Sequence, residues 1–74
     1  MKIKRIFTTE KTRATIAELE NGMYVAQVST MELAICSKVA EGYKVEKTIL
    51  GGMMMRNLAD FEDCVKMLKE EDFK

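Results

Sequence analysis

The side chains able to do chemistry are few in this chain. It has two cysteines, Cys36 and Cys64, and no histidine. Without an imidazole, the commonest general base is absent and Ser29 and Ser37 have nothing to activate them as nucleophiles. Two cysteines also fall short of the four ligands of a structural zinc site. We therefore expect no catalytic residue, no metal site and no cofactor, and we expect the protein not to be an enzyme.

The two thiols have unremarkable surroundings in the sequence. Cys64 lies in an apolar stripe with helical spacing, where cysteine is usually a small buried hydrophobe. A reactive Cys36 would need an exposed, electropositive setting, and Lys38 is the only basic residue close to it in sequence. We expect both thiols to be reduced in a cytoplasmic protein.

The methionines suggest an interface. Residues 53–55 are three methionines in a row, and alternate residues of a strand point to opposite faces. If residues 53–56 form a strand, some of these side chains project to the second face of the sheet. Gap-filling in a small core is the alternative, and an exposed apolar patch usually marks an interface. The candidate interface residues are Ile16, Met23, Val25, Met53, Met54 and Met55.

Basic residues gather in the first part of the chain, although the formal net charge is zero. The cations there could form a patch that contacts nucleic acid, with Tyr24 and Tyr43 as stacking groups. The neutral overall balance argues against this role, and a solvated surface is the simpler interpretation. The candidate nucleic-acid contacts are Lys2, Lys4, Arg5, Lys11 and Arg13.

A hairpin around Asn21-Gly22 organises the predicted sheet. Asn-Gly is typical of a two-residue type I′ turn, whose two central residues have positive φ. This turn would place Leu19 opposite Tyr24 and Ala17 opposite Ala26. The face with these four residues carries no charge, so we expect it to be the core face. The other face carries Ile16, Glu18, Glu20, Met23, Val25 and Gln27.

Further strands are predicted on both sides of the hairpin. Residues 2–8 and 43–50 have strand composition, and Gly51-Gly52 predicts a second tight hairpin leading into a short strand at 53–56. Residues 30–42 fit two structures. A helix over 30–41 would have Ser29 and Glu32 as a capping box, whereas alternating apolar residues and the continuing meander favour a strand. We predict the strand.

The C-terminal part predicts a helix over residues 57–71. Asn57 is a good N-cap, and Asp60 stands at the third helical position. Apolar residues recur at spacings of three and four from Leu58 to Leu68, which makes one stripe. We expect this stripe to pack on the sheet, with Phe61 over the small Ala17–Ala26 pair.

These elements predict an α+β fold: an antiparallel β-meander of four or five strands with one C-terminal α-helix packed on one face. We expect a single small domain over residues 1–74. The layout is similar to that of some single-strand-binding domains, an analogy of architecture that carries over no residue. No signal peptide or membrane-spanning run is visible, so we expect a cytoplasmic protein without a membrane partner.

For function, we expect a non-catalytic interaction module that self-associates as a homodimer, through the second face of the sheet or through an edge strand. A small core leaves stability marginal, and association is one way to increase it. The alternative is a single-stranded nucleic-acid-binding accessory protein with a basic N-terminal strand. The sequence does not identify a protein partner.

Overall fold

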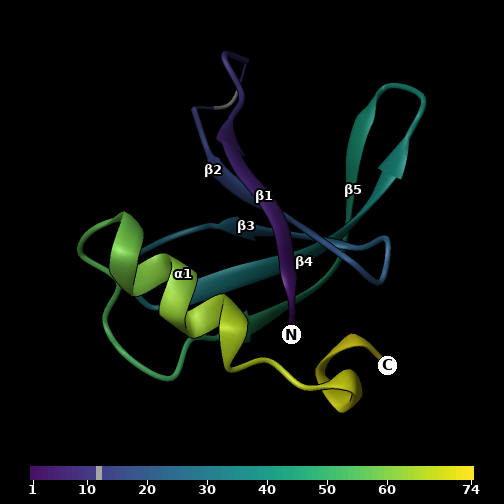
Figure 1. Cartoon of the computed structure of the whole chain (residues 1–74). Helices are drawn as coiled ribbons and strands as arrows, with labels where there is room; N and C mark the ends of the chain where they lie inside the picture. The colour runs from purple at the N-terminus through teal and green to yellow at the C-terminus, as the bar shows by residue number, and fades with distance from the viewer. Residues whose placement is uncertain (12) are drawn as a thin grey trace.

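Successive strands of the chain are neighbours in one antiparallel sheet, as the computed structural model shows for residues 1–11 and 13–74 (Figure 1). The sheet order in these residues is β1-β2-β3-β4-β5, which confirms a five-stranded meander followed by one C-terminal α-helix. The strands are β1 (Ile3–Thr8), β2 (Thr15–Leu19), β3 (Tyr24–Gln27), β4 (Glu32–Val39) and β5 (Gly42–Leu50).

The segment with two possible structures is a strand, as predicted. β4 pairs with β3 on one side and with β5 on the other, so its backbone groups are used in two ladders. Leu33 and Ile35 belong to the hydrophobic core, and Ala34 and Cys36 are buried on the opposite face. A helix over 30–41 would lose both ladders, because its backbone hydrogen bonds run within the segment.

The turn between β2 and β3 differs from the predicted type I′ turn. The Gly22 N–H donates to the Leu19 carbonyl at 3.1 Å, and the Leu19 N–H donates to the Met23 carbonyl at 2.9 Å. Gly22 has φ +88°, whereas Asn21 is not in the left-handed region. This geometry is a three-residue loop, Glu20-Asn21-Gly22, in which glycine takes the left-handed position after a type I turn. The Asn21 Oδ1 accepts the Met23 N–H at 2.8 Å and closes the loop.

The extra loop residue shifts the strand register by one, so the predicted pairing was wrong. Ala17 pairs with Val25 and not with Ala26, and Glu18 pairs with Tyr24. The prediction placed Tyr24 in the core and Val25 on the second face; the structure exchanges them, because a one-residue slip reverses which face a side chain occupies. The core face therefore carries Ala17 and Leu19 of β2 and Val25 of β3, and all three side chains are fully buried.

The predicted hairpin at Gly51-Gly52 and the strand at 53–56 are also wrong. After β5 the chain continues as a loop that returns beside the start of β4. The Gly51 N–H donates to the Met31 carbonyl and the Met55 N–H donates to the Thr30 carbonyl, both at 2.7 Å. Met55 is fully buried in the core. Its side chain shares the core cluster with Phe61 and Cys64, so the loop packs into the core and does not form a hairpin.

Helix α1 (Leu58–Lys66) begins as predicted and ends earlier. The Asn57 Oδ1 accepts the Asp60 N–H at 2.9 Å, which is the expected N-cap. Phe61, Cys64 and Val65 face the sheet and are buried. The predicted helix reached residue 71, but a short 3₁₀ helix η1 (Glu70–Phe73) follows a break after Met67.

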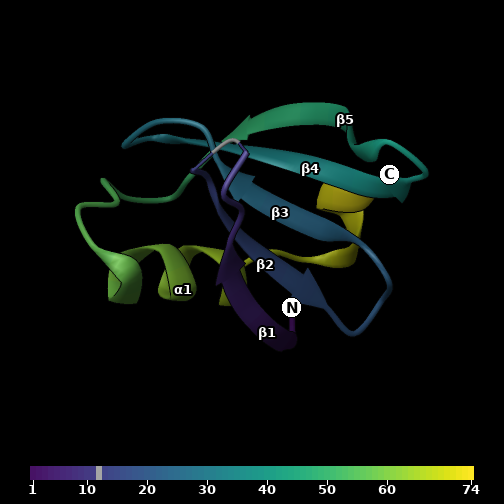
Figure 2. The same ribbon diagram turned by 90° about the horizontal axis from the view of Figure 1, so that it is seen from above.

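The helix α1 and the C-terminal segment lie on the same side of the sheet (Figure 2). Phe73 packs against the core from η1, and Phe61 shares the buried cluster with Ala17. Ala26 lies on the opposite face, so only half of the predicted Ala17–Ala26 depression is under the helix. The amino nitrogen of Met1 donates to the carbonyls of Lys66 and Leu68 at 2.7 and 2.8 Å, which joins the start of the described chain to the end of α1.

Replacing Phe61 tests the packing of α1 on the sheet. Phe61→Ala should lower the free energy of unfolding by about 3–5 kcal/mol, because it removes a fully buried ring and leaves a cavity. That cost is comparable with the total stability of roughly 5 kcal/mol expected of so small a core, so the variant should be largely unfolded. Urea denaturation followed by circular dichroism would measure this. Leu58→Ala, at an exposed position of the same helix, should cost less than about 0.5 kcal/mol; equal losses in both variants would contradict the packing.

Candidate functional site

The candidate site is the sheet face opposite α1, which we call the open face. It carries the side chains that alternate with the core residues along each strand. Strand pairing aligns Phe7 of β1 with Ile16 of β2, and continues the row through Ala26 and Ala34. No helix or strand in the described part of the chain covers this face, as Figure 2 shows.

Aromatic side chains connect the two outermost strands across the open face. The ring of Phe7 in β1 lies 6.5 Å, centroid to centroid, from the ring of Tyr43 in β5. Tyr43 also makes an edge-to-face contact with Tyr24 of β3, at a centroid distance of 5.1 Å. Because β1 and β5 are at opposite edges of the sheet order, these contacts require the sheet to curl toward its open face. Such ring pairs add about 0.5–1.5 kcal/mol each beyond the area they bury.

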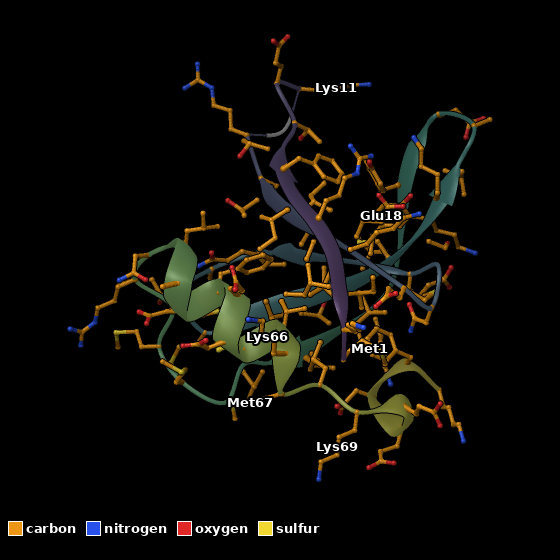
Figure 3. All side chains as sticks on the ribbon, viewed as in Figure 1. Met1, Lys11, Glu18, Lys66, Met67 and Lys69 are labelled. Carbon is orange, nitrogen blue, oxygen red and sulfur yellow. The ribbon has the colours of Figure 1, made fainter. Side chains whose placement is uncertain are left out.

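Charged groups surround the aromatic rings. The Arg5 Nε donates to the Glu18 Oε1 at 2.6 Å, and the Arg5 guanidinium lies 4.6 Å from the centre of the Phe7 ring. The Lys38 ammonium lies 4.6 Å from the centre of the Tyr43 ring. Both are cation–π arrangements. Figure 3 shows Glu18 between β1 and β5, where its side chain is only 17% exposed.

The pKa values of this cluster are shifted by their mutual contacts. The hydrogen bond from Arg5 lowers the pKa of the Glu18 carboxyl, against an opposing contribution from burial. The same hydrogen bond raises the pKa of Arg5. Burial raises the pKa of the Tyr24 hydroxyl, and the neighbouring Glu18 charge raises it further. The cluster therefore holds an ionised Arg5–Glu18 pair beside the neutral Tyr24 phenol at neutral pH.

An apolar groove of about 240 Å³ continues from the aromatic cluster along the open face. Ala26 and Ala34 lie opposite each other on β3 and β4, and their small side chains leave room between larger neighbours. The groove is lined by apolar side chains from all strands except β1, with Tyr43 at one end. Such a surface binds apolar groups by removing them from water. The apolar lining residues are Ala14, Ile16, Ala26, Val28, Ala34, Cys36, Tyr43 and Val45.

The surroundings of Cys36, the cysteine that lines the groove, do not favour a reactive thiol. Cys36 is buried, and burial followed by the negative charge of Glu46 raises the pKa of its thiol. Thiolate is the nucleophilic form, so these surroundings oppose reactivity. Cys64 is buried on the sheet-facing side of α1, and neither cysteine is in a disulfide. In the described part of the chain, no three histidine, cysteine, aspartate or glutamate side chains are grouped as a possible metal site.

The predicted interface residues do not share one face. Ile16 is on the open face, where it lines the groove. Val25 and Met55 are fully buried in the core, and Met23 packs beside that core. Met53 and Met54 are exposed in the loop before α1. These residues therefore do not lie together, because the turn at Glu20-Asn21-Gly22 has three residues and residues 53–56 form no strand.

The predicted nucleic-acid contacts are also dispersed. Lys4 and Arg5 meet at Glu18, with the Lys4 ammonium 3.8 Å from its carboxylate. Lys2 lies 3.8 Å from the Glu20 carboxylate, farther along the same edge. Lys11 and Arg13 are exposed in the loop between β1 and β2. Figure 3 shows Lys11 beyond the sheet.

Several side chains of the open face were not singled out from the sequence. Val28, Val45 and Leu50 are exposed apolar residues on or beside this face. Phe7 gave no signal of its contact with Tyr43, because the two residues are far apart in sequence and meet only in a curled sheet. The sequence Glu20-Asn21-Gly22 also fits a three-residue hairpin loop with glycine in the left-handed position. That loop would have predicted Tyr24 on the open face.

No protein-family model, curated protein or solved structure matches this chain. The open face is therefore interpreted from its own geometry and charge. No helix among residues 1–11 and 13–74 is both long and apolar enough to cross a membrane.

The Arg5–Glu18 pair predicts a pH dependence of stability. Because the folded-state pKa of Glu18 lies below its ordinary value of 4.5, its stabilising contribution is present above that value and is lost as the pH falls through the folded-state pKa. Glu18→Gln should be less stable than the wild type at neutral pH and should lose less stability on acidification. Denaturant unfolding at a series of pH values would measure both. Glu41→Gln, in the exposed β4–β5 turn, should keep the wild-type profile; an unchanged profile in Glu18→Gln would contradict the assignment.

Proposed function

We propose that this protein is a non-catalytic interaction module that self-associates through the open face of its sheet. The observation that carries the proposal is the apolar groove together with the exposed apolar side chains around it. Val28 and Val45 are each 56% exposed and Leu50 is 74% exposed. Apolar side chains gathered on an uncovered face are typical of a protein–protein contact.

The register supports continuity between the groove and these exposed residues. Val45 pairs with Cys36, and Leu50 pairs with Glu32, so both β5 side chains point to the open face. The Val28 N–H donates to the Glu32 carbonyl at 3.0 Å, which places Val28 at the same end of the sheet as Leu50. A partner that covered the groove would therefore also remove these side chains from water, a gain of about 25 cal/mol per Å² of apolar surface.

The charges of the open face favour a second copy of this chain as the partner. By register and alternation this face carries the cations Arg5 and Lys38 and the anions Glu18 and Glu32. Lys4, in the bulge of β1, adds one more cation near Glu18. A face that is close to neutral can meet its own copy without strong like-charge repulsion, and twofold symmetry places the same patch on both subunits.

Stability gives a second reason for association. A chain of 74 residues buries only about 60% of its unfolded surface, so its folded state is marginal as a monomer. A partner that binds only the folded chain adds stability in proportion to its concentration and affinity. A partner on the open face would cover the exposed apolar side chains around Ile16, Ala34 and Cys36, which are already buried on this face.

Charge substitutions on the open face should prevent self-association. Val45→Glu and Leu50→Glu should each weaken the dimer at least about tenfold, because association would bury an unpaired carboxylate. Light scattering over a concentration series would measure the molar mass at low and high salt. The wild type should approach the dimer mass in both salts, since apolar burial is little affected by screening.

The matched control is Leu58→Glu, an apolar-to-acidic change at a 57% exposed position of α1, away from the open face. It should dimerise like the wild type. A wild-type protein that stays monomeric throughout the series would overturn the proposal, as would equal loss of dimer in Leu58→Glu.

The aromatic cluster favours one second candidate, binding of single-stranded nucleic acid. Tyr24 and Tyr43 are in contact on the open face, with Lys38 over the Tyr43 ring. Arg5 lies over the neighbouring Phe7 ring, and aromatic rings beside cations are suited to stacking on bases. The support is weaker because Arg5 is already paired with Glu18, so few positive charges remain for phosphates.

Fluorescence anisotropy with a labelled single-stranded oligonucleotide would test this candidate. Tyr43→Ala should lose about 1–3 kcal/mol of binding free energy per stacked base, whereas Tyr43→Phe should keep most of it. The affinity should fall as salt rises. Absence of binding at low salt would rule out this function.

A further inference from the structure

A second surface, separate from the open face, lies at the edge of the sheet beside α1. A groove of about 660 Å³ runs between β1 and the helix. β1 is the first strand of the sheet order, so within the described residues one side of its backbone has no neighbouring strand. Figure 2 shows β1 at the end of the sheet nearest to α1. Unpaired N–H and C=O groups of an edge strand are a template for another strand.

The groove has apolar side chains along both walls. Leu58 lines it from α1, and its 57% exposure leaves it available to a partner. Glu62 and Lys66 follow Leu58 at intervals of four, so these three form one stripe of the helix along the groove. Ile3 and Ile6 line the opposite wall from β1.

The groove is also positively charged. The lining includes three cationic side chains: Lys2 just before β1, Arg5 in β1 and Lys66 in α1. Glu62 is the one anion among the lining residues of this groove, and its Oε1 lies 2.8 Å from the Lys66 ammonium. Lys2 and Arg5 are paired with Glu20 and Glu18, which lie outside the lining. Lys4 shares Glu18 and the Met1 ammonium adds a further charge, so cations still outnumber carboxylates around this groove.

We infer that this groove binds an extended acidic segment of a partner protein, which adds to the sheet as a strand beside β1. Main-chain hydrogen bonds to β1 would supply sequence-independent affinity, as in other strand-addition complexes. Side chains of the added strand alternate between its two faces. Those on the α1 side would meet Leu58, Ile3 and Ile6 and should be apolar. Those on the other side would meet Arg5 and should be acidic.

The charge pattern also selects against a second copy of this chain at the same edge. If two antiparallel copies paired over residues 2–5, Lys2 of each subunit would lie opposite Arg5 of the other, and like charges across a strand pair are destabilising. Lysine on an edge strand and a bulge, here between Ile3 and Arg5, are both devices that prevent indiscriminate strand pairing. An acidic strand, in contrast, would be attracted by the same cations. This groove is a different surface from the open face, so binding here does not depend on self-association.

The test uses a short capped peptide in which valine and glutamate alternate, titrated into the ¹⁵N-labelled protein. Amide signals of residues 2–6 and 58–66 should shift with saturation, and amide exchange in β1 should slow because its free edge becomes hydrogen-bonded. The affinity should fall at high salt. A peptide with lysine in place of glutamate should not bind.

Two variants locate the site. Leu58→Glu should weaken peptide binding at least about tenfold, since it removes an apolar contact and adds repulsion. Leu50→Glu, on the open face, should change peptide affinity by less than about twofold, because distant sites act independently. Lys66→Glu provides a second groove variant if Leu58→Glu fails to fold, as judged by circular dichroism.

The peptide result and the dimer result can fail separately. Loss of the dimer in Leu50→Glu with unchanged peptide binding would separate the two surfaces. The inference would be overturned if the acidic peptide does not bind at millimolar concentration, if the lysine peptide binds equally well, or if binding leaves β1 amide exchange unchanged.

Discussion

The left-handed conformation of Gly22 decides which side chains of the sheet meet the helix. With φ of +88°, Gly22 completes a three-residue loop and sets the register in which Ala17 opposes Val25. Since side chains alternate, every neighbouring position follows from that pairing: Val25 enters the core under Phe61, and Tyr24 turns to the open face. The register set by this turn thus determines both which residues form the core and which residues lie on the open face.

The curl of the sheet gives the open face its shape. Contacts among Phe7, Tyr24 and Tyr43 bring the first and last strands toward each other, although many residues separate them along the chain. Ala26 and Ala34 then become the base of a groove that a flat sheet would not have. The ion pair between Arg5 and Glu18 joins the adjacent strands β1 and β2 beside these rings.

Features that depend on residues close in sequence were predicted correctly. Features that depend on packing between distant parts of the chain were not. The N-cap at Asn57 was predictable because its hydrogen bond to Asp60 depends only on residues close in sequence. The strand Glu32–Val39 followed from the meander. The register was not predictable from Asn21-Gly22, because two turn types use the same pair and only the helix-facing core decides between them. Likewise, burial of Met55 overrides the hairpin signal of two glycines. The site depends on these same tertiary choices, so only Ile16 of its groove was predicted as an interface residue.

Arg5 is shared by the two surfaces. On the open face its guanidinium holds Glu18 and lies over the Phe7 ring, and the same residue lines the groove beside α1. An acidic group that drew Arg5 into that groove would leave the Glu18 carboxylate without its main partner, only 17% exposed and next to Tyr24. Thermodynamic linkage requires this effect to be reciprocal. An interaction that stabilises the Arg5–Glu18 pair lowers the affinity of the groove for an acidic ligand by the same factor by which that ligand weakens the pair. The strength of one ion pair on an edge strand would thereby set how tightly the groove beside α1 holds an acidic ligand.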